Sequence, residues 1–258
     1  MGRIYDAVYG YIELDDVEFK LVNSPIFQRL HWIKQLGPLN TVFPSAQHSR
    51  FSHSVGVFYI IQKMIKQIET DKAKFFEKVG DEEKRVLRLA ALLHDVGHVP
   101  LSHIGETVLK KTCPARIDPQ NIDPFGKKVP SWKVRFNERL RGDATKLHEC
   151  LSAEVILNSE EIDRILKGTD EWQNLKYRER IKERIALMVV GKPDNRVSRA
   201  MLHSELDADR LDYLLHYFAF QGSRGRRWAS PAVSGSKRAS RGGTLHSRQI
   251  LSAHAGDF

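Results

Sequence analysis

The sequence predicts an all-α protein. Apolar residues recur at helical spacing through most of residues 1–221, and runs of strict alternation are few. The 258 residues are 41% hydrophobic and 28% charged, which is ordinary for a globular protein with a sizeable core. No run of about 18 apolar residues is present, so no transmembrane helix is expected. The first 16 residues suit a short hairpin and do not resemble a secretory signal.

Caps, breakers and apolar periodicity predict the helices in order. Ser24 and Pro25 suit an N-cap and a first helical position, opening a helix that ends near Gly37. A second helix is predicted to begin near Arg50, and a third follows Asp81 as its N-cap and runs up to His94. Further helices are predicted over residues 101–110, 145–158, 159–168, 172–191 and 197–220.

Two segments lack this periodicity. Prolines and a glycine interrupt residues 113–145, which are predicted to form a long loop or insertion. Residues 222–258 are rich in Ser, Gly and Arg, and we expect a disordered tail there. The predicted organisation is therefore one domain over residues 1–221, followed by this tail.

The charge distribution does not predict a folded basic face. From Ser223 onward the chain has seven Lys or Arg and one acidic residue, whereas the preceding 222 residues have 34 basic and 31 acidic residues. Most of the formal net charge of +9 therefore lies in the tail. The two cysteines, Cys113 and Cys150, form no disulfide framework and favour reduced thiols in a cytoplasmic protein.

An adjacent His94-Asp95 pair lies at the predicted end of the third helix. It offers an imidazole nitrogen and a carboxylate oxygen, a mixed set that suits Mn, Fe, Zn, Ni or Mg. Neighbouring helical side chains diverge by about 100°, so the pair needs a distorted helix end, and we expect Gly97 to permit the unwinding. Alone, such a pair is weak evidence for a metal.

His53 and Asp209 strengthen the metal hypothesis. A histidine on an apolar helical face, like His53, is more often a core residue than a ligand. Asp209 shares a predicted helical face with Leu206 and Tyr213, and a carboxylate on an apolar face needs a partner such as a metal ion. The alternative, an acid at a helix N-terminus or in a salt bridge on a solvated stripe, is preferred for Asp207. Two His and two Asp together favour one site for a divalent ion.

The order His53, His94-Asp95, Asp209 resembles the H…HD…D signature of the HD superfamily, whose domain is a helical bundle. Further blocks resemble the deoxynucleoside triphosphate triphosphohydrolases, in particular the group of the animal sterile-alpha-motif/HD-domain enzyme and its bacterial relatives. The resemblance covers about residues 4–221. The blocks are DAVYGYIEL (6–14), FQRL (27–30), IKQLG (33–37), VFP (42–44), HSRFSHSVGV (48–57) and HDVGHVPLSH (94–103).

The resemblance implies an activity and a cofactor. Such enzymes hydrolyse a deoxynucleoside triphosphate, for example dGTP, to a deoxynucleoside and inorganic triphosphate. The implied ligands of one divalent ion, which would polarise the α-phosphate, are His53, His94, Asp95 and Asp209.

Three further histidines match active-site positions of this family. His148 would be the general acid for the leaving sugar oxygen, because an imidazole near its reference pKa of about 6.5 can donate a proton at neutral pH. His98 and His103 would contact phosphate oxygens. The alternative for His103 is an ordinary residue in the first turn of a helix.

Five other residues match substrate contacts of the family. Arg50 and Arg210 would face the phosphates, where a guanidinium fork suits anionic oxygens. The alternative for Arg50 is a solvated helix start. Contacts with the sugar and base would come from Gln35, Leu36 and Tyr213.

The resemblance is incomplete. Relatives continue past the Asp209 helix into a second lobe that supplies substrate contacts and oligomer surfaces, and this sequence has the Ser/Arg/Gly tail there. Asn23 and His31 stand where the animal enzyme uses an acid and an arginine for a regulatory guanine nucleotide, so GTP activation is not expected. Two other functions stay open: a different HD phosphodiesterase or nucleotidase, and a non-catalytic module that binds a nucleotide or nucleic acid. A homo-oligomer is compatible with the sequence, and a membrane partner is not expected.

Overall fold

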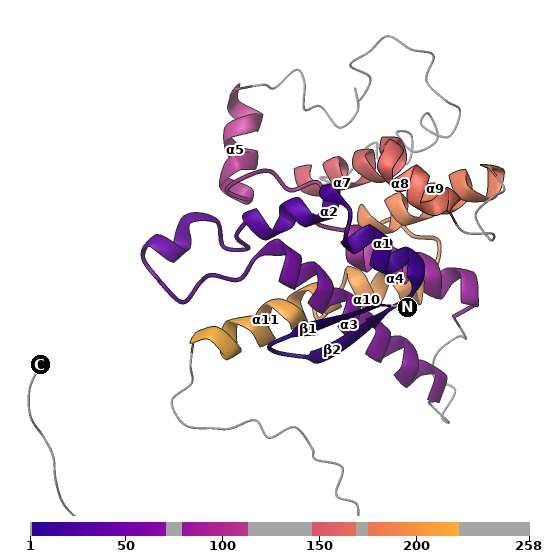
Figure 1. Ribbon diagram of the computed structural model, residues 1–258, viewed down its shortest axis with the longest axis horizontal. Helices are drawn as coiled ribbons and strands as arrows, with labels where there is room; N and C mark the ends of the chain where they lie inside the picture. Colours follow the sequence, from indigo (N-terminus) through magenta and orange to yellow (C-terminus); the bar gives the residue numbers. More distant parts are fainter. Residues whose placement is uncertain (1, 71–78, 113–145, 169–174, 222–258) are drawn as a thin grey trace, which may run out of the picture. The chain divides into compact units, whose positions relative to one another are not determined.

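The computed structural model describes residues 2–70, 79–112, 146–168 and 175–221. These residues form a mostly helical domain with a short N-terminal β-hairpin, which confirms the predicted fold class (Figure 1). The predicted insertion at 113–145, the predicted disordered tail at 222–258 and Cys113 lie outside the described residues. Within the described segments, no helix has the length and apolar character needed to cross a membrane.

The chain begins with a hairpin of β1 (Gly2–Asp6) and β2 (Gly10–Leu14), paired antiparallel. Alternation buries Ile12 and Leu14 on one face of β2. Helix α1 (Asp16–Val22) follows and was not among the predicted helices. The sequence motif that indicates the start of this helix is a capping box. The Asp15 side chain accepts a hydrogen bond from the Glu18 amide, and the Glu18 carboxylate accepts one from the Asp15 amide.

The predicted helix from Pro25 to Gly37 is wrong beyond its first turns. Ser24 is the N-cap with proline after it, as predicted, but the backbone is extended at Ile33. The Arg50 amide donates to the Ile33 carbonyl at 2.8 Å, and this pairing with the start of the next helix replaces helical hydrogen bonds. The segment forms three short helices: α2 (Pro25–Gln28), η1 (Arg29–Trp32) and η2 (Gly37–Thr41).

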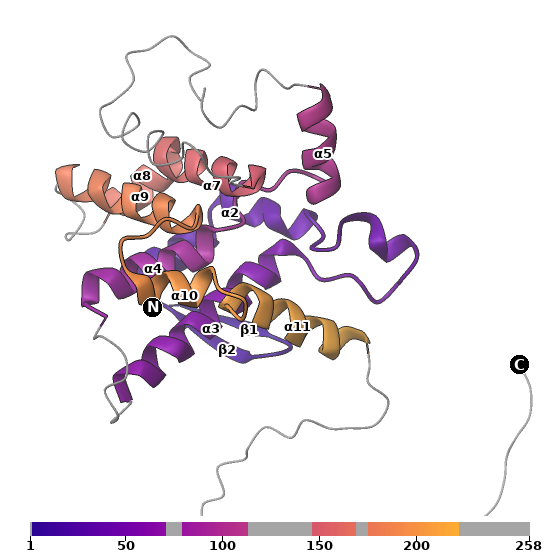
Figure 2. The same ribbon diagram turned by 180° about the vertical axis from the view of Figure 1, so that it is seen from behind.

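Three helices form the centre of the domain: α3 (Arg50–Thr70), α4 (Asp81–Leu93) and α11 (Ala208–Gln221). Helix α3 packs against both others, and Figures 1 and 2 show α11 and the hairpin beside it. Its apolar face is fully buried at Val57, Phe58 and Ile61, as the helical spacing predicts. Gly80 is the N-cap of α4, so the prediction of Asp81 as the cap is wrong by one residue.

A second group of helices packs around α9 (Leu175–Val189), which contacts both α4 and α7. Helix α5 begins two residues later than predicted, because Leu101 and Ser102 adopt positive φ angles of 67° and 52° in a tight turn. The remaining helices are α5 (His103–Thr112), α7 (Leu147–Asn158), α8 (Glu160–Lys167) and α10 (Arg196–Leu202).

The predicted continuous helix at 197–220 is wrong, because the chain breaks between α10 and α11. His203 ends α10 and its Nε2 lies 2.6 Å from the Met188 carbonyl oxygen, a contact that fixes the break. Asp207 is buried and its Oδ1 accepts from the Arg210 amide at 2.9 Å, which begins α11. Asp207 therefore lies at a helix N-terminus, as predicted, but it is buried and does not lie on a solvated stripe. Leu206 lies outside the helix and is exposed, so it shares no helical face with Asp209.

Candidate metal centre

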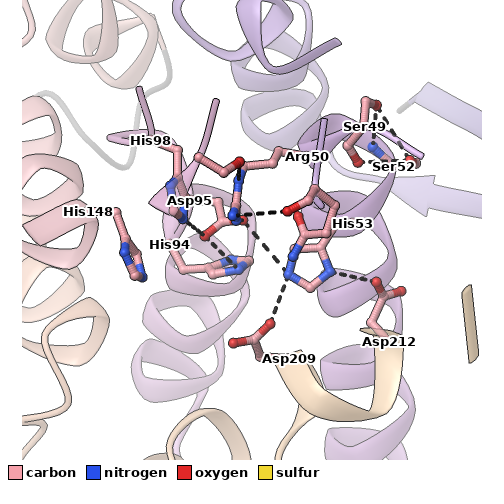
Figure 3. A network of polar contacts seen from close by, with 12 residues as sticks. Ser49, Arg50, Ser52, His53, His94, Asp95, His98, His148, Asp209 and Asp212 are labelled. Atoms are coloured by element: carbon pink, nitrogen blue, oxygen red, sulfur yellow. Dashed lines mark hydrogen bonds and ion pairs between the residues drawn. The ribbon is translucent and has the colours of Figure 1, made fainter. Parts of the chain in front are cut away.

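The ends of three helices bring the predicted ligands together (Figure 3). His53 lies in the first turn of α3, His94-Asp95 at the end of α4 and Asp209 in the first turn of α11. His53 Nε2 lies 2.8 Å from Asp209 Oδ1 and 3.8 Å from Asp95 Oδ2. His94 Nε2 lies 3.4 Å from Asp95 Oδ1. Ligand atoms of His53, His94 and Asp209 all lie within 4.8 Å of one another.

The His94-Asp95 pair converges because α4 ends at Leu93, as the prediction of a distorted helix end requires. Gly97 has no positive φ, so this position does not need glycine for a left-handed backbone conformation. Glycine is needed at this position because the backbone passes very close to α7. A Cβ at Gly97 would lie 2.1 Å from the Ser152 amide nitrogen. The Ser152 hydroxyl accepts from the Gly97 amide at 2.8 Å and donates to the His94 carbonyl at 2.6 Å, which fixes this corner.

Neighbouring acceptors set the orientation of both imidazoles. His94 Nδ1 lies 2.8 Å from the Ala91 carbonyl oxygen, which only accepts, so Nδ1 carries the hydrogen. His94 Nε2 is buried and makes no hydrogen bond within the described part of the chain. His53 Nδ1 lies 2.7 Å from Asp212 Oδ2. Each ring therefore directs Nε2 to the common point, an arrangement typical of metal-binding histidines.

The electrostatics of the site favour a cation. Burial lowers the pKa of His53, but hydrogen bonds to Asp209 and Asp212 outweigh burial and raise it to about 10. Burial raises the pKa of Asp209, and the contact with His53 outweighs it, so the pKa lies below its ordinary value. A divalent ion would provide the positive charge that a proton on His53 otherwise supplies. Two imidazoles and two carboxylates thus fit Mn, Fe, Zn, Ni or Mg.

Arg50 holds Asp95 in place. Its Nη1 lies 2.5 Å from Asp95 Oδ2, and its Nε donates to the Ser102 hydroxyl at 2.8 Å. Burial raises the pKa of Asp95, and Arg50 is the largest opposing cause, so the pKa falls well below the ordinary value. The side chain of Arg50 is only 2% exposed, which excludes a solvated helix start. In this structure its guanidinium contacts Asp95, one of the predicted metal ligands.

The three other predicted histidines gather around Glu106. Glu106 Oε1 lies 2.9 Å from His98 Nδ1, 3.1 Å from His148 Nδ1 and 3.4 Å from His103 Nδ1. These four residues form a second group with the geometry to hold an ion. His98 Nε2 lies 3.3 Å from Asp95 Oδ1, so the two groups adjoin. Glu106 was not predicted, although its position three residues after His103 places both on one helical face.

Proton positions in this second group follow from the same contacts. Burial raises the pKa of Glu106, and its contacts with the three histidines outweigh burial and lower the pKa below its ordinary value, so the carboxylate is ionised. Burial lowers the pKa of His148 more than Glu106 raises it, so the pKa lies below its ordinary value. His148 is therefore neutral at pH 7, with its hydrogen on Nδ1 facing Glu106.

Apart from Arg50, the four predicted substrate contacts divide into two sets. Arg210 is exposed and lines a cavity of about 480 Å³ together with His94, His148 and Asp209. The other set does not line this cavity: it comprises Gln35, Leu36 and Tyr213, all of them half-buried.

Asp212 is a site residue that was not predicted. It lies three residues after Asp209, on the same side of α11, and this D-x-x-D spacing is the signal that would have indicated it. Its side chain is 1% exposed and contacts His53 directly.

Helical packing and the convergent His and Asp side chains define a class, the metal-dependent phosphohydrolases of the HD type. Residues 50–215 match the HD domain family, so the chain belongs to it.

Relatives of this chain include both uncharacterized and named proteins. YwfO of Bacillus subtilis (strain 168), an uncharacterized protein, is 28% identical over 210 residues, which are 81% of this chain and 38% of YwfO. The deoxynucleoside triphosphate triphosphohydrolase SAMHD1 homolog of Dictyostelium discoideum is 38% identical over 104 residues, 40% of this chain and 20% of that protein. This chain thus spans less than half of these curated relatives.

A solved structure shows the same fold. A phosphohydrolase from Bacteroides thetaiotaomicron VPI-5482 superimposes with a TM-score of 0.58 at 27% identity, covering 88% of this chain and 44% of that one.

Proposed function

We propose that the protein hydrolyses a deoxynucleoside triphosphate, such as dGTP, to a deoxynucleoside and inorganic triphosphate, using one divalent ion. The observation that carries the proposal is the convergence of His53, His94 and Asp209, with Asp95 adjacent, on one point. The named relatives support the substrate class, because the SAMHD1 proteins of Dictyostelium discoideum and Homo sapiens are 38% and 37% identical over 104 residues each.

The proposed chemistry breaks the bond between the α-phosphorus and the 5′ oxygen of the sugar. Water supplies the new oxygen on phosphorus, and the leaving 5′ oxygen takes up a proton. His53, His94, Asp95 and Asp209 would hold the ion, and a divalent ion held there would supply Lewis-acid polarisation of the α-phosphate and a lower pKa for water. Arg50 and Asp212 orient two of these four side chains.

His148 is the proposed proton donor. Glu106 holds its Nδ1, which leaves Nε2 to carry the transferred proton. His148 is neutral in the substrate-free protein. The negative charge of a bound triphosphate raises the pKa of His148, so this side chain takes up its proton when the substrate binds. His98 and His103 are proposed to contact phosphate oxygens. Sugar and base contacts are proposed for Gln35, Leu36 and Tyr213, where an aromatic wall disfavours a 2′-hydroxyl.

A second function is a different HD phosphodiesterase or nucleotidase. The observation that favours it is the absence of Gln35, Leu36 and Tyr213 from the cavity beside the ion ligands.

Product analysis separates the two functions. The full chain is incubated with dGTP and Mg²⁺ or Mn²⁺, and the products are resolved by ion-exchange chromatography. Inorganic triphosphate with deoxyguanosine in equal amounts is the expected result. Orthophosphate or pyrophosphate, or turnover of monophosphates or cyclic nucleotides alone, would support the second function. Asp209→Ala should abolish turnover, while Asp81→Ala, an exposed change at the start of α4, should not.

A further inference from the structure

A short turn after α4 connects the ion ligand Asp95 to the histidines around Glu106. The His98 amide donates to the Asp95 carbonyl at 3.0 Å, so the chain reverses sharply between these two residues. His98 then lies between both parts of the site, with Nε2 3.3 Å from Asp95 Oδ1 and Nδ1 2.9 Å from Glu106 Oε1. Its ring stacks on that of His148, with centroids 4.1 Å apart (Figure 3). The position of this turn therefore sets the geometry of both imidazoles.

Two side chains from other elements hold the main chain of this turn. Ser152, on α7, donates to the His94 carbonyl at 2.6 Å. On the η1 side, the carbonyl oxygens of Val96 and His98 both accept from one guanidinium nitrogen, Arg29 Nη2, the second of them at 2.9 Å. Main-chain oxygens that lie outside regular secondary structure need such partners when they are shielded from water. Arg29 thus contacts the carbonyl of His98 itself.

Arg29 is held in this place by its neighbours in the sequence. Phe27 and Leu30 are fully buried on either side of it, and η1 packs against α3. Arg29 itself is half-buried, and burial lowers its pKa. Among the described residues no carboxylate lies within ion-pair distance of its guanidinium. Partial burial of a charge without an ionic partner costs free energy, so a stabilising ion pair does not account for an arginine here, whereas its two main-chain contacts do.

We infer that Arg29 is a positioning residue for the reaction, and that its guanidinium fixes the turn in which His98 spans Asp95 and Glu106. The inference rests on the proposed function and deepens it, because His98 is proposed to contact phosphate oxygens. Arg29 does not line the cavity of about 480 Å³ beside the ion ligands, so it acts through the turn and not on the substrate. A displacement of reacting groups by about 1 Å can cost about 100-fold in rate.

Turnover of dGTP by the full chain in saturating Mn²⁺ tests the inference. Arg29→Ala removes both hydrogen bonds to the turn, and kcat should fall about 10–100-fold. KM should stay within about twofold, because Arg29 does not contact the substrate. Guanidinium chloride, well below the concentration that unfolds the chain, should restore part of kcat, since the free cation can donate to the same two oxygens. Arg29→Lys should give an intermediate kcat, because it keeps the charge but places its nitrogen one bond closer to the main chain.

Arg88 provides the matched control. It is also half-buried, but its guanidinium donates two hydrogen bonds of 2.6 Å to the buried carboxylate of Glu18 and contacts no residue of the site. Arg88→Ala should lower the free energy of unfolding, because it leaves that carboxylate without its partner. Its kcat should stay within about twofold of the unmodified chain, with no response to guanidinium. An equal fall of kcat in the two variants, or an unchanged kcat in Arg29→Ala, would overturn the inference.

Ring signals of ¹⁵N-labelled histidine separate this inference from the proposed function. The His98 signal, assigned by its loss in His98→Gln, should shift in Arg29→Ala and not in Arg88→Ala. If dGTP is not hydrolysed but the signal shifts in this way, the proposed function fails while the contact of Arg29 with the turn stands. If dGTP is hydrolysed and Arg29→Ala leaves both signal and kcat unchanged, the function stands and the inference fails. Should circular dichroism show that Arg29→Ala does not fold, Arg29→Lys takes its place in each measurement.

Discussion

Asp212 Oδ2 lies 2.7 Å from His53 Nδ1, and Asp209, one turn earlier in the same helix, lies 2.8 Å from Nε2 of the same ring. One helix thus supplies a carboxylate to each nitrogen of His53. The Tyr9 hydroxyl donates to the other oxygen of Asp212 at 2.6 Å, which fixes that carboxylate. Asp212 therefore sets the tautomer in which His53 Nε2 can bind an ion.

Asp212→Asn should weaken ion binding. The amide keeps the shape of the side chain but removes the charge that holds the hydrogen on His53 Nδ1. Metal affinity should fall about 10–100-fold, the usual effect of losing such a partner. Competition with a chelator measures it, with Asp81→Asn as an exposed control. Unchanged affinity in Asp212→Asn would show that the Asp212 contact does not orient the ligand.

Glu106→Gln should reduce turnover and leave the ion in place. Glu106 contacts all three histidines of the second group and none of the proposed ion ligands. Without its charge the rings lose a common acceptor, and we expect kcat to fall about 100-fold, within the range for loss of general acid–base catalysis. Metal content and kcat are measured on the same sample. Loss of metal together with turnover would mean that Glu106 belongs to the ion site.

Gly97→Ala should destabilise the fold. The added Cβ would lie 2.1 Å from the Ser152 amide nitrogen, a backbone atom that cannot move aside. Overpacking of this kind costs about 1–3 kcal/mol. Urea unfolding measures the free energy, and Gly80→Ser is the control, because a Cβ there meets nothing within 4 Å and serine is a preferred residue at this helix N-cap. Equal stability of the two variants would contradict the close approach to α7.

His216 should make stability depend on pH in alkaline solution. Burial lowers its pKa, and the nearby carboxylates of Asp212 and Asp6 outweigh burial and raise it to about 9. Because the folded pKa exceeds the unfolded value of about 6.5, the stabilisation is complete below about pH 6.5 and is lost as pH rises through about 9. The free energy of unfolding should decline across this window in the unmodified chain.

The matching variant for this pH dependence is His216→Gln, which cannot be protonated. Its free energy of unfolding should decline less steeply between about pH 6.5 and 9, because one titrating group is absent while His53, whose pKa is raised to about 10, still contributes a decline. A decline equal to that of the unmodified chain would assign the pH dependence to another group.

The central helices were predictable because their signals are local. Apolar spacing along α3 and the Ser24-Pro25 start of α2 need no information from elsewhere in the chain. The misassigned segments depend on distant contacts. The extended backbone at Ile33 exists because Arg50 pairs with it, and the break at His203 exists because Met188 accepts its hydrogen bond.

The residues of the candidate site likewise fall into those that the sequence predicted and those that only the structure shows. His53, His94, Asp95 and Asp209 were predictable as a set of donor types in a fixed order. Glu106 and Asp212 orient imidazoles and do not belong to that signature, and only the spatial arrangement shows what they contact. The pairing of Arg50 with Asp95 likewise depends on the approach of α3 to the end of α4.

The metal content of the purified chain tests the central claim most directly. Elemental analysis of protein prepared without added metal should find one divalent ion per chain. Asp209→Ala should lower this content strongly while far-UV circular dichroism shows the helices retained, because Asp209 is partly exposed and carries no core packing. An unmodified chain that binds no ion, even after incubation with Mn²⁺ or Zn²⁺, or an Asp209→Ala variant with undiminished metal, would contradict the account.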